Sequence, residues 1–139
     1  MKTFIAYRHT GEDPAALEKL LGSVRSAFDQ AGVSAYATFF DETVFQAKSM
    51  GAKEIMSHAF AVINESDFLF VIQSSDSKSE GLLMEVGYCL AKGIPVVVAT
   101  HQNVKHTYLP EMATLSISWV GPQDLISKIA EVDFSKLKF

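Results

Sequence analysis

The 139-residue sequence lacks the features of several large protein classes. It has one cysteine, Cys89, so no disulfide can form within the chain, which fits a reducing compartment. No apolar run approaches the roughly 20 residues of a membrane helix, and residues 1–8 are too few and too early charged for a signal peptide. Lys and Arg form no long cluster, and the formal net charge is −4. We therefore expect a soluble cytoplasmic protein that binds neither membranes nor nucleic acid.

Several familiar site motifs are also missing. The chain contains no G-x-G-x-x-G and no P-loop, which leaves dinucleotide and nucleoside-triphosphate sites of the usual kinds unsupported. It has no G-x-S-x-G, so an α/β-hydrolase is not indicated. The four histidines do not have the spacing of metal ligands, among themselves or with Cys89. We expect no metal and no cofactor.

What the chain does have is a regular alternation of apolar segments and helical patterns. Apolar residues make up 48% of the sequence, enough for a sizeable core. Asp13-Pro14 is typical of a helix start, and Gly32 and Gly93 are placed to end helices. The polar stretch 41–49 and residues 101–111 are interpreted as connections. We predict strands at 3–7, 34–40, 68–72, 94–99 and 115–120, and helices from Asp13 to Gly32 and at about 51–65, 79–92 and 122–130.

This alternation predicts an α/β fold in a single domain spanning residues 1–139. Five strands and four main helices favour a flavodoxin-like, doubly wound parallel sheet of order 2-1-3-4-5 with helices on both faces. Ligands of such sheets bind at the carboxyl ends of the strands where the order reverses, here strands 1 and 3. The loops 8–13 and 73–80 are therefore expected to meet at the site.

Glu85 is the acid that stands out, because it lies in the apolar run Leu82-Leu83-Met84-Glu85-Val86. On a helix that packs against the sheet this carboxylate would be buried, and burial raises the pKa of a carboxyl group, as suits a nucleophile or an acid–base group. The alternative is a glutamate that leans out to solvent. Gly87, in the same helix, indicates either a close approach of the helix backbone or a tolerated imperfection.

The loops at the predicted crevice supply further candidates. Tyr7 either borders a sugar site or packs in the core. Arg8 either holds a phosphate or base carbonyl, or pairs with a nearby acid of its own loop. His9 is either a substrate contact or a solvated loop residue. In the serine-rich loop 73–81, Ser79 or Ser77 caps the following helix, whose free amides also favour an anion.

The segment Ser-Glu-Gly-Leu-Leu-Met-Glu-Val-Gly-Tyr, followed by Ala-Lys-Gly-Ile-Pro-Val, resembles the nucleoside 2-deoxyribosyltransferase family, which includes deoxynucleoside-monophosphate N-glycosidases. Gly81, Glu85, Gly87 and Pro95 match its pattern, and Asp67 matches the start of the third strand. The resemblance spans about residues 3–100. It implies that Glu85 is the nucleophile in cleavage of an N-glycosidic bond, by hydrolysis or transfer, in two steps like those of retaining glycosidases.

The resemblance also implies a set of site residues. Ser79 stands where the monophosphate hydrolases carry a phosphate-binding serine, which favours hydrolysis of a 5′-nucleotide over base exchange. The family's second carboxylate falls on Ala59, so Asp76, Glu80 or His58 would have to replace it as proton donor. Otherwise the chain binds nucleotides without efficient turnover. The family implies a homo-oligomer, with loop 101–110 reaching across a dimer. The predicted catalytic residues are Glu85 and Asp76, and the predicted substrate-binding residues are Tyr7, Arg8, His9, Gly11, Ser79, Glu80 and Gly81.

A second resemblance is to TIR domains. Phe4-Ile5-Ala6-Tyr7-Arg8 is similar to their first strand, and 77–85 is similar to their box around a glutamate that cleaves NAD in the enzymatic members. Gly81 replaces the tryptophan of that box, which favours the deoxyribosyltransferase family. A NAD-cleaving TIR-like enzyme and a non-catalytic nucleotide-binding or interaction module remain the alternatives.

Overall fold

Five short apolar strands form one parallel sheet at the centre of the protein. The computed structural model describes residues 1–138. The strands at 68–73 and 96–101 are buried along most of their length, as expected where helices cover both faces of a sheet. The observed order, β2-β1-β3-β4-β5, confirms the predicted fold class and strand order. The strands are β1 (Lys2–Ala6), β2 (Ser34–Tyr36), β3 (Phe68–Gln73), β4 (Val96–His101) and β5 (Leu115–Trp119).

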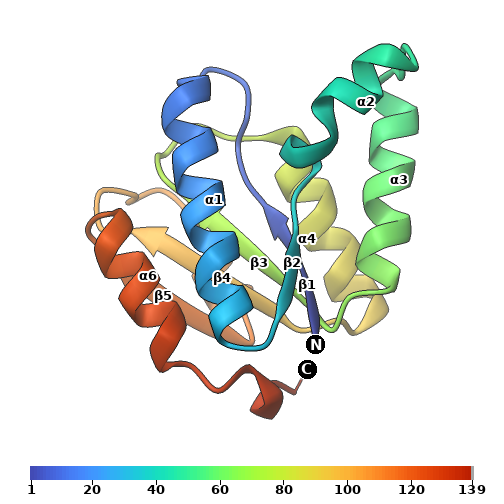
Figure 1. Ribbon diagram of the computed structural model, residues 1–139. Helices are drawn as coiled ribbons and strands as arrows, with labels where there is room; N and C mark the ends of the chain where they lie inside the picture. The colour runs from blue at the N-terminus through green and yellow to red at the C-terminus, as the bar shows by residue number, and fades with distance from the viewer. Residues whose placement is uncertain (139) are drawn as a thin grey trace.

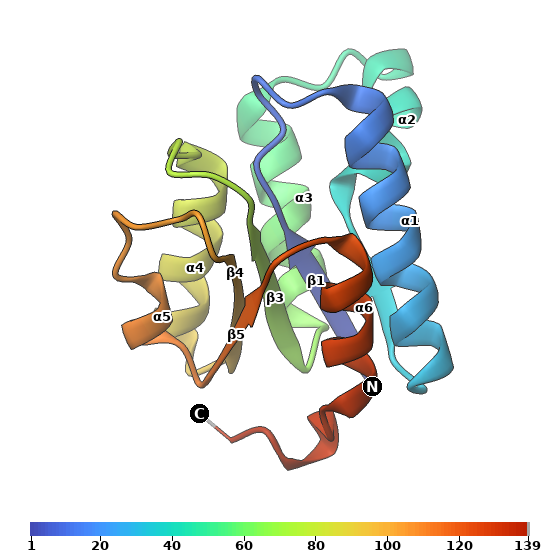
Figure 2. The same ribbon diagram turned by 90° about the vertical axis from the view of Figure 1, so that its left-hand side faces the viewer.

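The helices cover the sheet in two layers, shown from two sides in Figures 1 and 2. One core lies under α1 and α6, and the other under α3 and α4, with α5 beside them. Thus each buried strand contributes alternate side chains to the two cores. The helices are α1 (Pro14–Gln30), α2 (Glu42–Ala47), α3 (Ala52–Asn64), α4 (Glu80–Lys92), α5 (Leu109–Met112) and α6 (Pro122–Glu131), with 3-10 turns η1 (Thr38–Asp41) and η2 (Phe134–Lys136).

Helix ends follow the local sequence closely. The Asp13 carboxylate accepts a hydrogen bond from the amide of Ala16 at 3.3 Å, ahead of Pro14 in the first turn of α1. Ser79 caps α4 in the same way. Gly93 ends α4 with a φ of 71°, which glycine adopts without steric cost. These ends confirm the predicted starts of two helices and fix where the loops toward the strand ends begin.

Three predicted segments differ in the structure. β2 stops at Tyr36, so the strand predicted over 34–40 is too long. β2 pairs only with β1. Beyond its end, the ring of Phe39 packs against Tyr7 and the ring of Phe40 lies under Arg25. The connection predicted at 41–49 contains α2, and the loop at 101–111 contains α5. Both helices are too short to show a clear hydrophobic period in sequence.

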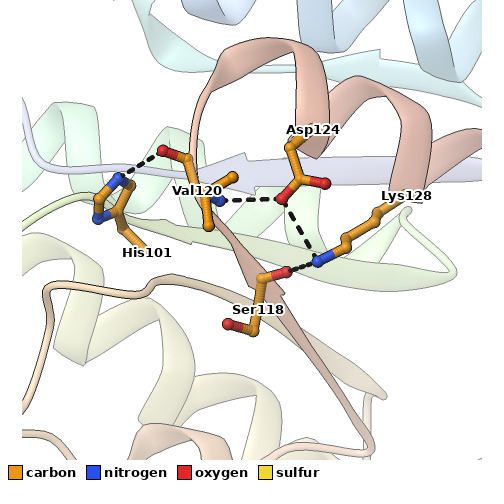
Figure 3. A network of polar contacts seen from close by, with 5 residues as sticks. All are labelled: His101, Ser118, Val120, Asp124 and Lys128. Carbon is orange, nitrogen blue, oxygen red and sulfur yellow. Dashed lines mark hydrogen bonds and ion pairs between the residues drawn. The ribbon is translucent and has the colours of Figure 1, made fainter.

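A polar network fixes the C-terminal edge of the sheet (Figure 3). The Asp124 carboxylate of α6 accepts from the amide of Val120 at 2.9 Å and lies 3.3 Å from Nζ of Lys128, which also donates to the carbonyl of Ser118. Nε2 of His101 lies 3.0 Å from the Val120 carbonyl. These contacts join β4, β5 and α6, and they give the Asp124 carboxylate two partners.

Candidate active site

Glu85 lies in the second turn of α4 on the face that packs against the sheet. Leu82, Val86 and Cys89 of the same face are buried, and Glu85 is only 8% exposed. Within residues 1–138 it is the one buried residue of a charged type; the other buried polar residue, Thr3, donates to the carbonyl of Phe68. Thus the inward-facing interpretation of Glu85 is confirmed, and the solvent-facing alternative is wrong.

Burial sets the electrostatics of Glu85. It raises the pKa of the carboxyl group from 4.5 to about 8, because water no longer solvates the charged form. Within residues 1–138, no hydrogen bond and no cation lowers the pKa of Glu85 again. A buried acid without a partner costs several kcal/mol when ionised. Such a group is common at functional sites, where a ligand completes its surroundings.

Glu85 lines a cleft of about 830 Å³, a volume in the range of small-molecule sites. The cleft lies between the carboxyl end of β1, the segment around α2, and helices α3 and α4. It joins apolar and polar side chains, as ligand sites usually do. Its lining includes five predicted substrate-binding residues, Tyr7, His9, Ser79, Glu80 and Gly81, together with Glu85, Thr38, Glu42, Phe45, Lys53, Met56, Ala59 and Phe60.

Tyr7 follows β1 directly and contributes both to packing and to the cleft. Its ring contacts Phe39 edge-on at 6.3 Å, and its hydroxyl lies 3.3 Å from Oγ1 of Thr38. Burial raises the pKa of the Tyr7 hydroxyl to about 12, with smaller contributions from the charges of Glu42 and Glu85. The phenol therefore stays protonated at neutral pH and can donate a hydrogen bond beside Glu85.

A pair that sequence reasoning missed lies in the same cleft. Nε2 of His9 is 3.2 Å from Oε1 of Glu42, the first residue of α2. Their side chains are 52% and 33% exposed, so both reach the open part of the cleft. Glu42 was overlooked because its segment was interpreted as a connection. The only signal in the sequence was the pair of acids that follows Phe39 and Phe40.

The position where a second carboxylate was expected carries no acid. Ala59 is buried and lines the cleft. Its neighbour His58 turns elsewhere: Nε2 lies 2.9 Å from the Tyr36 hydroxyl, which donates to Asp41 at 2.7 Å. His58 is not part of the cleft lining. The structure thus gives His58 a role in anchoring β2 to α3 and η1, not beside Glu85.

Arg8 lies beside the cleft in a small hollow of about 30 Å³, where the loops after β1 and β3 meet as predicted. Its guanidinium pairs with Glu12 at 2.9 Å, as the alternative interpretation of Arg8 predicted. The Nε atom of Arg8 is buried and has no hydrogen-bond partner in residues 1–138. Gly11 has a φ of 84°, and a Cβ there would come within 2.8 Å of Arg8 Nη2. Ser79 lines both the hollow and the cleft, and the hollow also contains Ser74, Ser75, Ser77 and Lys78.

The structure does not bring Asp76, the other predicted catalytic residue, to Glu85. Asp76 is exposed and accepts hydrogen bonds from the amides of Lys105 and His106, both at 2.9 Å. These two amides lower the pKa of its carboxyl group, so Asp76 is not suited to act as a proton donor.

Gly87 of α4 is exposed, with nothing within 4 Å of an added Cβ. A close approach of the backbone is therefore wrong as the reason for this glycine.

Cys89 is fully buried, and burial, followed by the charge of Glu85, raises the pKa of its thiol to about 12. Among residues 1–138, no three His, Cys, Asp or Glu side chains gather as a metal site would require. Within the same range, no helix has the length and apolar character needed to cross a bilayer.

The fold and the cleft define a flavodoxin-like α/β protein with a buried glutamate, without a partner in residues 1–138, in a cleft at the carboxyl end of β1. The family model for nucleoside 2-deoxyribosyltransferase matches residues 11–130, so the chain belongs to that family. No curated protein matches the chain in sequence.

Solved structures agree with this fold. The CMP N-glycosidase of Clostridium botulinum superposes with a TM-score of 0.70 at 13% identity, covering 93% of this chain and 97% of that one. A 2-deoxyribosyltransferase from the psychrotolerant bacterium Bacillus psychrosaccharolyticus gives 0.66 at 19% identity, covering 100% and 97%. A conserved protein from Enterococcus faecalis V583 gives 0.60 at 16% identity, covering 93% and 96%. At these identities the likeness establishes the fold alone.

Proposed function

We propose that this protein cleaves the N-glycosidic bond of a nucleoside or nucleoside 5′-monophosphate, with Glu85 as the nucleophile. The observation that carries the proposal is a buried carboxylate that has no partner among residues 1–138 and lines a cleft of ligand size. Membership of a family of enzymes of the N-glycosidase and deoxyribosyltransferase type supports the class of bond. Solvation would favour an exposed glutamate, so its position against the sheet is expected to serve a ligand.

The chemistry follows from the groups in the cleft. An oxygen of the ionised Glu85 attacks the anomeric carbon as the bond to the base nitrogen breaks, and the base leaves with the electron pair. Water, or a second base, then attacks the same carbon and releases Glu85. Tyr7 stays protonated next to Glu85, so its hydroxyl is suited to orient the carboxylate or the sugar.

A 5′-monophosphate is the favoured substrate form. Ser79 lies at the N-terminus of α4 between the cleft and the hollow that contains Arg8 and Lys78. Cationic side chains and the free amides of a helix N-terminus both favour a phosphate. The pair between Arg8 and Glu12 would have to open or share the guanidinium when phosphate binds. Water as acceptor, and thus hydrolysis, is the reaction we expect with such a substrate.

The test is direct. Wild-type protein is incubated with deoxynucleosides, ribonucleosides, their 5′-monophosphates and NAD, and free base is measured by chromatography. We expect base from a monophosphate, and loss of that release by about a thousandfold or more in Glu85→Gln. The matched control is Glu65→Gln, an exposed acid at the end of α3 outside the cleft. Absence of base from every substrate would contradict the proposal.

Ala59 gives the strongest support to a second candidate, a nucleotide-binding module without turnover. An alanine fills the cleft position where the resemblance implied the second carboxylate. In that case a nucleotide would bind, measured by calorimetry, but no base would appear. Release of nicotinamide from NAD alone would instead support the TIR-like alternative, because both chemistries break the same kind of bond.

The predicted homo-oligomer and cytoplasmic location complete the proposal. Several large apolar side chains are exposed on and near α4 and α5, namely Leu83, Met84, Tyr108 and Met112. Apolar groups of this kind are commonly covered by a subunit contact. Sedimentation velocity of the wild-type protein is expected to give a dimer or a larger species. A monomer at all concentrations would contradict this part of the proposal.

A further inference from the structure

The cleft poses a chemical problem that Glu85 does not solve. A base that leaves with the electron pair of the glycosidic bond carries excess negative charge unless it receives a proton. Ala59 has no proton to give, His58 is bonded to Tyr36, and Asp76 is bonded to two amides of another loop. If the proposed function is right, another group has to supply the proton.

The pair of Glu42 and His9 lies where such a group is needed. Both side chains line the cleft that contains Glu85, and they come from α2 and from the loop after β1 rather than from α4. The charges of Glu42 and Glu85 both raise the pKa of the Tyr7 hydroxyl. The two carboxylates and the Tyr7 phenol therefore line one cavity.

The position of the pair is fixed by its neighbours. The ring of His9 packs edge-on against Phe39 at 6.2 Å. Asp41, which precedes Glu42, accepts the hydrogen bond from Tyr36, and Phe45 of α2 is buried with its ring 5.5 Å from His58. Thus the polar contacts of Tyr36 and the packing of Phe45 hold α2 against β2 and α3, which keeps Glu42 at the cleft.

We propose that Glu42 and His9 together form the acid–base group of this site, in place of the carboxylate missing at Ala59. In the first step, the proton held between Oε1 of Glu42 and Nε2 of His9 moves to the base as its bond to the anomeric carbon breaks and Glu85 bonds to that carbon. In the second step, a water oxygen attacks the carbon, Glu85 leaves, and the pair takes the proton that the water loses. Each step conserves charge and atoms, and no further reactant is required.

The inference rests on the proposed function and predicts a selective defect. Glu42→Gln and His9→Gln are assayed beside wild type on two matched substrates. One is the nucleotide that wild type cleaves; the other has a base that leaves without an added proton. For a purine the second substrate is the N7-methylated nucleotide, and for a pyrimidine it is the 5-nitrouracil nucleotide. Glu85→Gln serves as the nucleophile control, and Glu80→Gln as the rival acid in the cleft.

We expect each of Glu42→Gln and His9→Gln to lower kcat on the ordinary nucleotide by about a hundredfold or more, and on the activated one by less than about fivefold. Glu85→Gln should lose both reactions. Equal losses on both substrates, or no loss on either, would overturn the role of the pair while leaving the proposed function intact. A selective defect in Glu80→Gln but not in Glu42→Gln would do the same. No base from wild type on any substrate would overturn the proposed function and this inference together.

Discussion

Two acids of this protein, Asp124 and Glu85, lie in opposite kinds of environment. Asp124 lies partly exposed at the C-terminal edge of the sheet and has an amide and an ammonium group as partners (Figure 3). The amide of Val120 and Lys128 lower the pKa of its carboxyl group. Glu85 is buried, has no such partner in residues 1–138, and its pKa rises to about 8.

The difference separates a structural acid from a candidate reactive one. At the Asp124 edge, folding gives the carboxylate an amide and an ammonium group as partners, so it does not need a ligand to complete its surroundings. At the cleft, folding desolvates Glu85 and leaves it next to open volume. Proteins commonly accept lower stability at sites of function, and the comparison predicts where this one does so.

The largest expected effect is a gain in stability on Glu85→Gln. Because the folded-state pKa is raised, the free energy of unfolding of wild type falls as pH rises from about 4.5 to about 8, while the neutral amide is insensitive. We expect the variant to be more stable by about 2–4 kcal/mol at pH 9 and nearly equal to wild type at pH 5. Urea unfolding at both pH values measures this, and equal stability at pH 9 would show that Glu85 finds a partner in solution.

The next effect is on the pH dependence of base release. The nucleophile must be ionised, and the carboxyl of Glu85 in the ligand-free protein ionises at about pH 8. We expect kcat/KM to rise about tenfold per pH unit below that value. Initial rates from pH 5.5 to 9.5 provide the measurement. A midpoint near the ordinary pKa of glutamate would mean that the cleft solvates Glu85.

A smaller effect is expected for Tyr7→Phe. Removing the hydroxyl leaves the contact with Phe39 but removes the donor beside Glu85. We expect kcat to fall about tenfold, because the variant cannot donate a hydrogen bond to Glu85 or the sugar during turnover, with little change in melting temperature. Phe39→Leu is the matched control for packing. A loss of stability as large as the loss of kcat would indicate that Tyr7 serves the core alone.

The smallest effect is expected for Asp124→Asn. Asp124 is partly exposed at the surface, so water screens its contacts with Val120 and Lys128. The lowered pKa means that it stabilises the fold above its unfolded-state pKa and that this contribution is lost as pH falls through the folded-state value. We expect a slightly lower melting temperature at pH 7, no difference near pH 2, and unchanged base release. Any loss of base release would break the contrast with Glu85.

Much of the fold could be predicted from the sequence because its signals are local. The apolar runs at 68–72 and 94–99 indicated strands buried on both faces, and Asp13-Pro14 and Gly93 indicated helix ends. Short elements were missed. α2 has six residues and only Phe45 is buried, so no period could reveal it.

The site was predictable only in part, because two residues that are far apart in the sequence and meet in the fold produce no motif of regular spacing. Glu85 was evident from its apolar neighbours, whereas the contact of His9 with Glu42 joins residues 33 positions apart on two connections. Asp76 was misjudged for the same reason: its partners, Lys105 and His106, are 29 and 30 positions away. The sequence showed an acid in a crevice loop but not the amides that lower its pKa.

In the proposed reaction, Glu85 bonds covalently to the sugar during turnover. A 2-deoxy-2-fluoro analogue of the cleaved nucleotide slows release of such an intermediate, because fluorine destabilises the transition state that carries charge at the anomeric carbon. After incubation and proteolysis, mass spectrometry should find the fluorosugar phosphate on the peptide that contains Glu85, and none in Glu85→Gln. An adduct on a different residue, or cleavage of the analogue with no adduct, would contradict the account.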